Sequence, residues 1–337
     1  MPAPDVPAAE SPERIPVTLV TGFLGSGKTT LIGHLLRQDG FAGTLVVVNE
    51  FGEAGIDHDL LEASSDDTIL LANGCLCCTI RGNLVDTLLD VLAQRESGRL
   101  RVFDRVIVET SGIADPAPVL AFLMSDRRVM ARYRLGAVVT TCDAVAGFET
   151  LVRQPEAASQ VRLADRLLVT KTDLAPADGV ALLDRRLRAL NPLAPIHHVV
   201  PGAVDAAWFL DPWAEAKGAQ ATAYAECCDD PAHHHAHHTD RFTATVLHAT
   251  RDLTEAEMPA LIEAVRAYAG PHLLRLKALL PLAGGRVLIV QAALMTVHDL
   301  DIGPALRAPS GRLVLITEGA SPGPLVEALA PLGLLSA

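Results

Sequence analysis

The chain has 337 residues, 50% of them hydrophobic, which is enough for a sizeable core and about two domains. The 40 Asp and Glu against 28 Lys and Arg give a net charge of −12, and no basic run interrupts this balance, so we expect no nucleic-acid partner. A run of about 18 apolar residues, the length that spans a membrane, does not occur, so we expect no membrane partner.

The N-terminal segment and the cysteines indicate where the protein works. Residues 1–14 are rich in Pro and acidic side chains and lack an apolar segment, so we expect a disordered lead-in and not a signal peptide. Five of the six cysteines fall in two tight clusters, at 75–78 and 227–228. Clustered thiols without a secretion signal indicate metal or redox chemistry in a reducing cytoplasm.

From Val17 to Val199, short β-branched runs alternate with helical patterns. The nearly unbroken apolar runs are typical of parallel strands that are buried on both faces. Strands separated by helices predict an α/β fold with a doubly wound, mostly parallel sheet. The predicted strands are 17–21, 44–49, 68–71, 105–110, 136–142, 166–170 and 196–199, and helices are predicted over 28–37, 83–95, 117–124 and 179–190.

The first predicted strand leads into a glycine-rich loop, GFLGSGKT, which fits the pattern G-x-x-x-x-G-K-[ST]. Backbone N–H groups of such a loop, and the N-terminus of the helix after it, attract phosphate oxygens. Lys28 is expected to reach the β- and γ-phosphates, and the Thr29 hydroxyl to ligate Mg²⁺. The loop therefore predicts a nucleoside triphosphate site formed by Gly22, Gly25, Ser26, Gly27, Lys28, Thr29 and Thr30.

The next two predicted strands are each followed by chemically distinctive residues. Asn49-Glu50-Phe51-Gly52-Glu53 ends the second strand, where GTPases place a switch region, and its two acids could also be plain surface residues. After the third strand, Cys75 and Cys77 would lie about 7 Å apart on one side of an extended chain. A modest bend would bring both thiolates to one ion, with Cys78 as a third ligand if the chain curls there. Three small buried residues or a redox pair are the alternatives.

The fourth predicted strand carries Glu109 at its end and is followed by Ser111-Gly112. Glu109 lies where an acid can hold the water shell of Mg²⁺, and Gly112 lies where a backbone N–H can sense the γ-phosphate. An acid at a strand end is common in general. Its position between the glycine-rich loop and the strand predicted over 166–170 favours a role in the nucleotide site.

The strand predicted over 166–170 ends in Thr170-Lys171-Thr172-Asp173, close to the N-K-x-D sequence that reads guanine in GTPases. An ionised Asp173 only accepts hydrogen bonds, so it can take the N1–H and N2–H donors of guanine together. Adenine has no matching donors. GTP is therefore the predicted nucleotide, with Thr170 replacing the usual Asn; a strand with an ordinary polar turn is the alternative.

Residues 206–240 read as a linker that carries Cys227-Cys228 and a histidine run. Imidazoles and thiolates at this density bind zinc, nickel, copper or cobalt, so we expect this segment to capture and relay ions. Beyond it, strands predicted over 242–248, 286–292 and 312–317 and helices over 255–268 and 324–329 indicate a smaller α+β domain at 241–337. The histidines of the run are His233, His234, His235, His237 and His238.

Taken together, these motifs resemble the CobW-type metallochaperone GTPases, in the same wider class as the urease and hydrogenase maturation GTPases. The resemblance implies a G domain with a buried Cys-x-Cys-Cys metal site coupled to nucleotide state, and a small C-terminal domain after a His-rich linker. It covers residues 15 to about 200 and is carried by GFLGSGKTT (22–30), VNEFGEAGID (48–57), NGCLCC (73–78), ETSGIADPAPV (109–119) and TKTD (170–173).

The resemblance also implies roles for residues whose function the sequence pattern alone leaves open. It makes Glu50 and Glu53 candidates for auxiliary metal ligands or for coupling between metal and nucleotide. Arg275-Leu276-Lys277 looks like the R-x-K element of the family, with Ala278 where a glycine is usual.

We therefore expect a cytoplasmic two-domain protein, with a GTPase domain at 15–205, in which slow GTP hydrolysis gates delivery of Zn²⁺ or Co²⁺ to a client metalloprotein or metal-cofactor enzyme. The sequence selects neither the metal, the client nor the oligomeric state. One alternative is a metal buffer with incidental GTP turnover. A P-loop kinase is another, and TKTD and NGCLCC argue against it.

Overall fold

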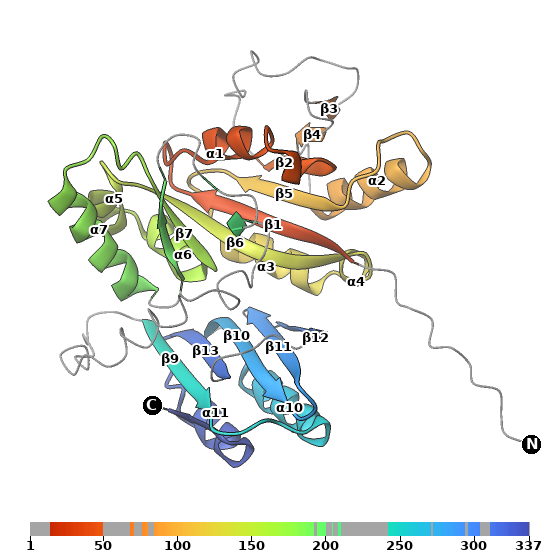
Figure 1. Ribbon diagram of the computed structural model, residues 1–337, viewed down its shortest axis with the longest axis vertical. Coiled ribbons are helices and arrows are strands. Elements are labelled where there is room, and N and C mark those ends of the chain that lie inside the picture. Colours follow the sequence, from red (N-terminus) through yellow and green to blue (C-terminus); the bar gives the residue numbers. More distant parts are fainter. Residues whose placement is uncertain are drawn as a thin grey trace, which may run out of the picture.

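The computed structural model describes residues 14–49, 68–70, 76–79, 84–191, 194–199, 204, 208–209, 242–270, 272–293, 296–303 and 311–336. These residues form two separate sheets, each with helices and a hydrophobic core (Figure 1). Within those ranges, no helix has the length and hydropathy needed to cross a membrane.

The first sheet contains 8 strands in the order β3-β4-β2-β5-β1-β6-β7-β8. Neighbouring strands run parallel except for the edge pair β3–β4, which is antiparallel. The strand order reverses beside β1, and ligands of open α/β sheets bind at the carboxyl ends of strands at such a point. The strands are β1 (Ile15–Gly22), β2 (Thr44–Asn49), β3 (Thr68–Leu70), β4 (Leu76–Thr79), β5 (Arg105–Thr110), β6 (Tyr133–Asp143), β7 (Arg166–Thr170) and β8 (Ile196–His198).

Both faces of this sheet are covered, which explains the continuous apolar character of its strands. In β2, Leu45 and Val47 pack into the core on one face, and Val46 and Val48 pack into the core on the other. The helices are α1 (Lys28–Leu35), α2 (Leu84–Glu96), α3 (Pro116–Ser125), α4 (Arg127–Met130), α5 (Gly147–Arg153), α6 (Pro155–Leu163) and α7 (Ala177–Leu190), with a 3-10 turn over Asp39–Phe41.

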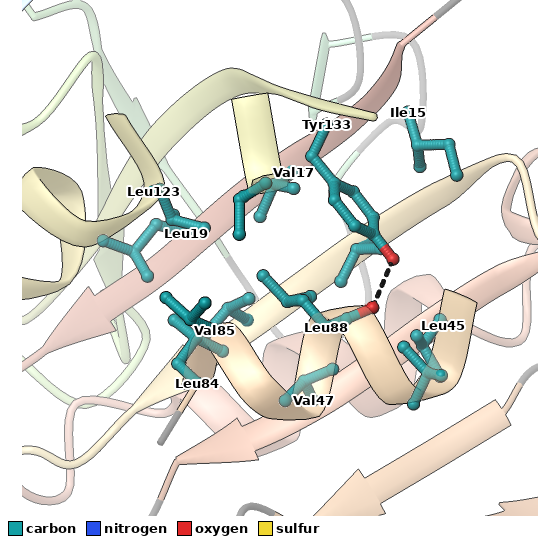
Figure 2. Packing of buried hydrophobic residues seen from close by; sticks show 14 of the residues in the cluster. Ile15, Val17, Leu19, Leu45, Val47, Leu84, Val85, Leu88, Leu123 and Tyr133 are labelled. Atoms are coloured by element: carbon teal, nitrogen blue, oxygen red, sulfur yellow. Dashed lines mark hydrogen bonds between the residues drawn. The ribbon is translucent and has the colours of Figure 1, made fainter. Parts of the chain in front are cut away.

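One core of the first domain lies between the sheet, α2 and α3 (Figure 2). Leu84 and Leu88 of α2 join Val17 and Leu19 of β1 in this core. Tyr133 is also buried there, and its hydroxyl donates a hydrogen bond to the Leu88 carbonyl at 2.8 Å, so its polar end is satisfied. Burial raises the pKa of Tyr133.

The doubly wound fold predicted from the sequence is confirmed. The strands over 44–49, 105–110 and 166–170 begin and end where they were predicted, whereas β4 and the helices α4 to α6 were not predicted. Phe209 is fully buried and its ring lies 5.7 Å from that of Phe41. The core of the first domain therefore includes a residue beyond the predicted boundary at 205.

The second sheet contains 6 strands in the order β12-β11-β10-β13-β9-β14, and its neighbours pair antiparallel. Leu261 and Val265 of α10, and Leu325 and Leu329 of α11, pack into its core. This is the predicted α+β domain, although β10, β12 and β14 were missed. Its elements are β9 (Phe242–Ala249), a 3-10 turn (Glu255–Glu257), α10 (Met258–Tyr268), β10 (Leu273–Leu282), β11 (Arg286–Ala293), β12 (Thr296–Gly303), β13 (Arg312–Glu318), α11 (Gly323–Leu329), a 3-10 turn (Ala330–Leu332) and β14 (Leu334–Ser336).

A buried cluster of charges joins the two domains. Asp165, between α6 and β7, pairs with Arg275 at 2.9 Å and with Lys277 at 3.4 Å, both from β10. The same carboxylate accepts a hydrogen bond from the Val138 N–H at 2.9 Å. The Asp165 side chain is 4% exposed and that of Arg275 is 5% exposed. The Arg-x-Lys element of the second domain therefore binds the first domain.

Candidate functional site: a phosphate loop and a base-reading turn

The glycine-rich loop begins where β1 ends, between β5 and β6. At Gly22 the backbone φ is 140°, and a Cβ atom there would lie 2.3 Å from Thr141 Oγ1 on β6. Only glycine fits this close approach. Ser26 of the same loop shares a 2.6 Å hydrogen bond with the Thr141 hydroxyl. Two contacts with one residue of β6 thus hold the loop in place.

The residues that are predicted to bind phosphate and Mg²⁺ lie together beside this loop. Lys28 Nζ donates hydrogen bonds to the carbonyls of Gly22 at 2.9 Å and Phe23 at 3.3 Å, so the ammonium lies on the loop itself. The Thr29 hydroxyl donates to Glu109 Oε1 at 2.6 Å, although the two residues lie on different elements. A hydroxyl and a carboxylate are the hard oxygen donors that Mg²⁺ prefers.

The turn after β5 approaches the glycine-rich loop closely. A Cβ atom on Gly112 would lie 2.6 Å from the backbone nitrogen of Leu24, so a side chain there would force the loop to shift. The turn closes with a hydrogen bond of 3.0 Å from the Ala114 N–H to the Ser111 carbonyl. The Asp115 carboxylate then caps α3. At Gly112 the backbone of the turn therefore lies directly against the loop.

The turn from Thr170 to Asp173, which is predicted to read the base, is tied to the phosphate loop through Thr170. Its hydroxyl donates to the Ser26 carbonyl at 2.8 Å, so this threonine holds the loop. Lys171 adopts φ 57°, an uncommon conformation for a residue with a side chain, and its Nζ bonds Asp143 at 2.6 Å. Asp173, two residues after Lys171, is exposed and accessible to a ligand.

The backbone register relates the cysteine segment to the nucleotide site. Val47 of β2 pairs with Cys78 of β4 on one side and with Val108 of β5 on the other. One residue further, Val48 pairs with Thr79 and with Glu109. Neighbouring strands lie about 4.8 Å apart, so the β4 backbone is roughly 10 Å from the strand that carries Glu109.

Comparison with known proteins agrees with this geometry. Residues 16–198, more than half of the chain, match the model of the CobW/HypB/UreG nucleotide-binding domain. The chain belongs to the CobW/HypB/UreG family. It is 40% identical over 191 residues to the zinc chaperone YjiA of Escherichia coli, covering 57% of this chain and 59% of that protein, so this match spans less than two thirds of YjiA.

A second relative in the CobW/HypB/UreG family matches over more of this chain. The zinc chaperone CobW of Pseudomonas aeruginosa is 32% identical over 299 residues, covering 80% of this chain and 78% of that protein. In three dimensions, the crystal structure of Zn(II)-bound YjiA GTPase from E. coli matches with a TM-score of 0.66 and 29% identity, covering 95% of this chain and 99% of that one. The likeness to that structure therefore extends over both domains.

Much of the predicted metal site lies outside the described residues: Glu50, Glu53, Cys75 and the histidines between 233 and 238. For Cys77 and Cys78 the structure gives the backbone, which stays extended through Thr79 and does not curl at Cys78. The condition under which Cys78 would join Cys77 as a third ligand is therefore not met, because neighbouring residues of a strand point to opposite faces. In the described ranges, no three His, Cys, Asp or Glu side chains gather in a way that could hold a metal ion. The ligand roles stay predictions.

Three residues of the site were not singled out from the sequence. Thr141 and Asp143 lie at the carboxyl end of β6, beside the phosphate loop and the base-reading turn. Polar residues that end a buried strand next to the loop are the signal that could have found them. The third, Gln160, bonds the turn at Gly112 from the unpredicted helix α6, and nothing in its sequence context marks it.

Proposed function

We propose that this protein is a GTP-hydrolysing metallochaperone that binds Zn²⁺ or Co²⁺ at Cys75 and Cys77 of its Cys-x-Cys-Cys motif and delivers it to a client metalloprotein or metal-cofactor enzyme. The family, and relatives that are named zinc chaperones, support this proposal. The clustered thiols are suited to a reducing cytoplasm, where we propose that the protein works.

The nucleotide half of the proposal rests on the loop geometry. Thr29 and Glu109, 2.6 Å apart, would hold Mg²⁺ and its waters. When bound, the ion neutralises charge on the β- and γ-phosphate oxygens. Lys28 would turn from the loop carbonyls to those phosphates, and the Gly112 N–H would meet the γ-phosphate. Asp173 would accept the two N–H donors of guanine.

The proposed coupling between metal and nucleotide rests on the register of β2. This is the main observation that supports the proposal. One strand lies between the strand of Cys77 and Cys78 and the strand of Glu109, and it pairs with both neighbours residue by residue. A movement of β5 on nucleotide exchange would therefore reach β4 through backbone hydrogen bonds. Thiolates suit Zn²⁺, and Co²⁺ almost as well.

Titration of GTP affinity with and without metal tests this coupling. At fixed Mg²⁺, we expect Zn²⁺ or Co²⁺ to tighten GTP binding in the wild type by a factor of about 5 to 150, and GTP to tighten metal binding by the same factor, because linkage is reciprocal. The double variant Cys75→Ser, Cys77→Ser should lose most of its metal affinity and all metal effect on GTP, since a hydroxyl is a far poorer ligand than a thiolate.

Cys142→Ser provides a matched control. Cys142 is buried at the end of β6, and burial, with a smaller contribution from the Asp143 carboxylate, raises the pKa of its thiol to about 12. The thiol therefore stays protonated and is a poor metal ligand. The control should retain the coupling of the wild type. If wild-type GTP affinity is the same with and without metal, the chaperone mechanism is wrong, and a metal buffer with incidental GTP turnover is the better description.

A further inference from the structure

The side chain of Gln160 binds the turn that faces the phosphate loop. Gln160 is fully buried in α6, and its Nε2 donates to the carbonyls of Gly112 at 3.1 Å and Ala114 at 3.0 Å. Both neighbours are carbonyl oxygens, which only accept hydrogen bonds, so the nitrogen of the amide must face them. The orientation of this side chain is therefore determined by its partners.

The helix that carries Gln160 is itself anchored to the sheet. The Thr140 hydroxyl on β6 donates a hydrogen bond to the Gln160 backbone carbonyl at 2.9 Å. The adjacent Ser159 donates to the Asp115 carboxylate at 2.9 Å, at the far end of the same turn. Consecutive residues of one helix thus hold the turn at Gly112, at Ala114 and at Asp115.

Burial makes the hydrogen bonds that the Gln160 amide donates difficult to replace. Gln160 and Gly112 are both buried, so water cannot take over the Gly112 carbonyl if the amide is removed, whereas Ala114 is partly exposed. The turn also lies against the phosphate loop, where Gly112 leaves no space for a side chain beside Leu24. A shift of the turn would therefore move the Gly112 N–H relative to the loop.

We propose that Gln160 is a positioning residue for GTP hydrolysis. It holds the 112–114 backbone so that the Gly112 N–H meets the γ-phosphate, while Gln160 itself touches neither nucleotide nor Mg²⁺. This inference rests on the proposed GTPase activity. It implies a specific pattern: Gln160 affects triphosphate binding and hydrolysis, and has little effect on GDP, which lacks the γ-phosphate.

The test compares Gln160→Leu with Gln154→Leu, the same substitution at an exposed glutamine just before α6. The assays measure kcat and KM for GTP, and the affinities for GDP and a non-hydrolysable GTP analogue. Loss of the two amide hydrogen bonds, of which the one to Gly112 is buried, should lower kcat in Gln160→Leu roughly tenfold and weaken analogue binding, while GDP affinity stays within about twofold. Gln154→Leu should match the wild type in all four quantities.

Gln160→Glu provides a second readout and decides the question if the leucine variant does not fold. An ionised carboxylate would face two carbonyl oxygens, whereas the protonated acid can donate to one of them. Its kcat relative to the wild type should therefore rise as the pH falls.

The outcomes separate this inference from the proposed function. A wild type that does not hydrolyse GTP contradicts the proposed function itself. With an active wild type, the positioning role is overturned by any of three results: a Gln160→Leu kcat within about twofold of the wild type, equal losses of GDP and GTP-analogue affinity, or a Gln160→Glu to wild-type ratio that does not change with pH.

Discussion

Replacing Asp165 with Asn removes the carboxylate that pairs with Arg275 and Lys277 at the domain junction. The Asn side chain has nearly the same shape, and its oxygen can still accept the hydrogen bond from the Val138 N–H. The substitution therefore removes the charge and also places an N–H donor at the Oδ1 position, which accepts from Arg275 and Lys277 in the wild type. The Arg275 guanidinium stays buried in the variant but lacks this carboxylate.

The size of the effect follows from the pKa of Asp165. Burial raises this pKa, but Arg275, Lys277 and the Val138 N–H together outweigh burial and lower it from 3.8 to about 2. At about 1.4 kcal/mol per pKa unit, ionisation of Asp165 stabilises the folded protein by about 2 kcal/mol. Removing one partner of a buried ion pair costs about 3–5 kcal/mol. We therefore expect Asp165→Asn to lower the free energy of unfolding by about 2–5 kcal/mol at neutral pH.

Urea unfolding followed by circular dichroism and tryptophan fluorescence measures this difference. Asp104→Asn is a matched control, because Asp104 is 65% exposed and pairs with Arg105 at the surface, so its loss should cost at most about 1 kcal/mol. Adding Arg275→Met to Asp165→Asn should restore part of the stability, because the buried cation is then replaced by an apolar side chain.

The pH dependence gives a second measurement with a defined sign. Because the folded-state pKa of Asp165 lies below its unfolded value of 3.8, its contribution is present above about pH 4 and is lost as the pH falls toward 2. The stability gap between wild type and Asp165→Asn should therefore close over that range. A gap at neutral pH no larger than that of the surface control, or one that persists unchanged to pH 2, would refute the reasoning.

Three further predictions concern the proposed activity. Lys28→Ala should abolish GTP hydrolysis and weaken triphosphate binding while the domain stays folded, although loss of the buried bond to the Gly22 carbonyl should lower its melting temperature; wild-type turnover in this variant contradicts the phosphate role. Asp173→Asn should shift preference from guanine to xanthine nucleotides in competition binding, because the new amide also donates; equal affinity of the wild type for ATP and GTP would show that Asp173 does not read the base. Deleting residues 230–239 should lower the number of metal ions bound, counted by titration, and leave GTP hydrolysis nearly unchanged; loss of hydrolysis would show that this segment belongs to the fold.

The fold of the first domain was accessible from sequence because its signals are local. Buried parallel strands are continuous apolar runs, and those over 44–49, 105–110 and 166–170 were located to the residue. Four strands were missed, and in two of them, β4 and β10, the residues indicated something other than a strand. The β4 sequence LCCT contains the cysteines of a metal motif, and β10 contains Arg275, Lys277 and Pro281, although it is a central strand of the second sheet.

From the sequence we could predict the chemistry of the site: a loop for phosphates, a hydroxyl and an acid for magnesium, and an acceptor for guanine. The residues that hold these groups in place are seen only in the folded domain. Thr170 bonds the phosphate loop, Asp143 holds Lys171, and Gln160 holds the turn at Gly112. Each of these pairs joins residues that lie far apart in the chain. Motif spacing reports on neighbours along one strand or loop, whereas such contacts depend on how strands order themselves in the sheet, which no local pattern encodes.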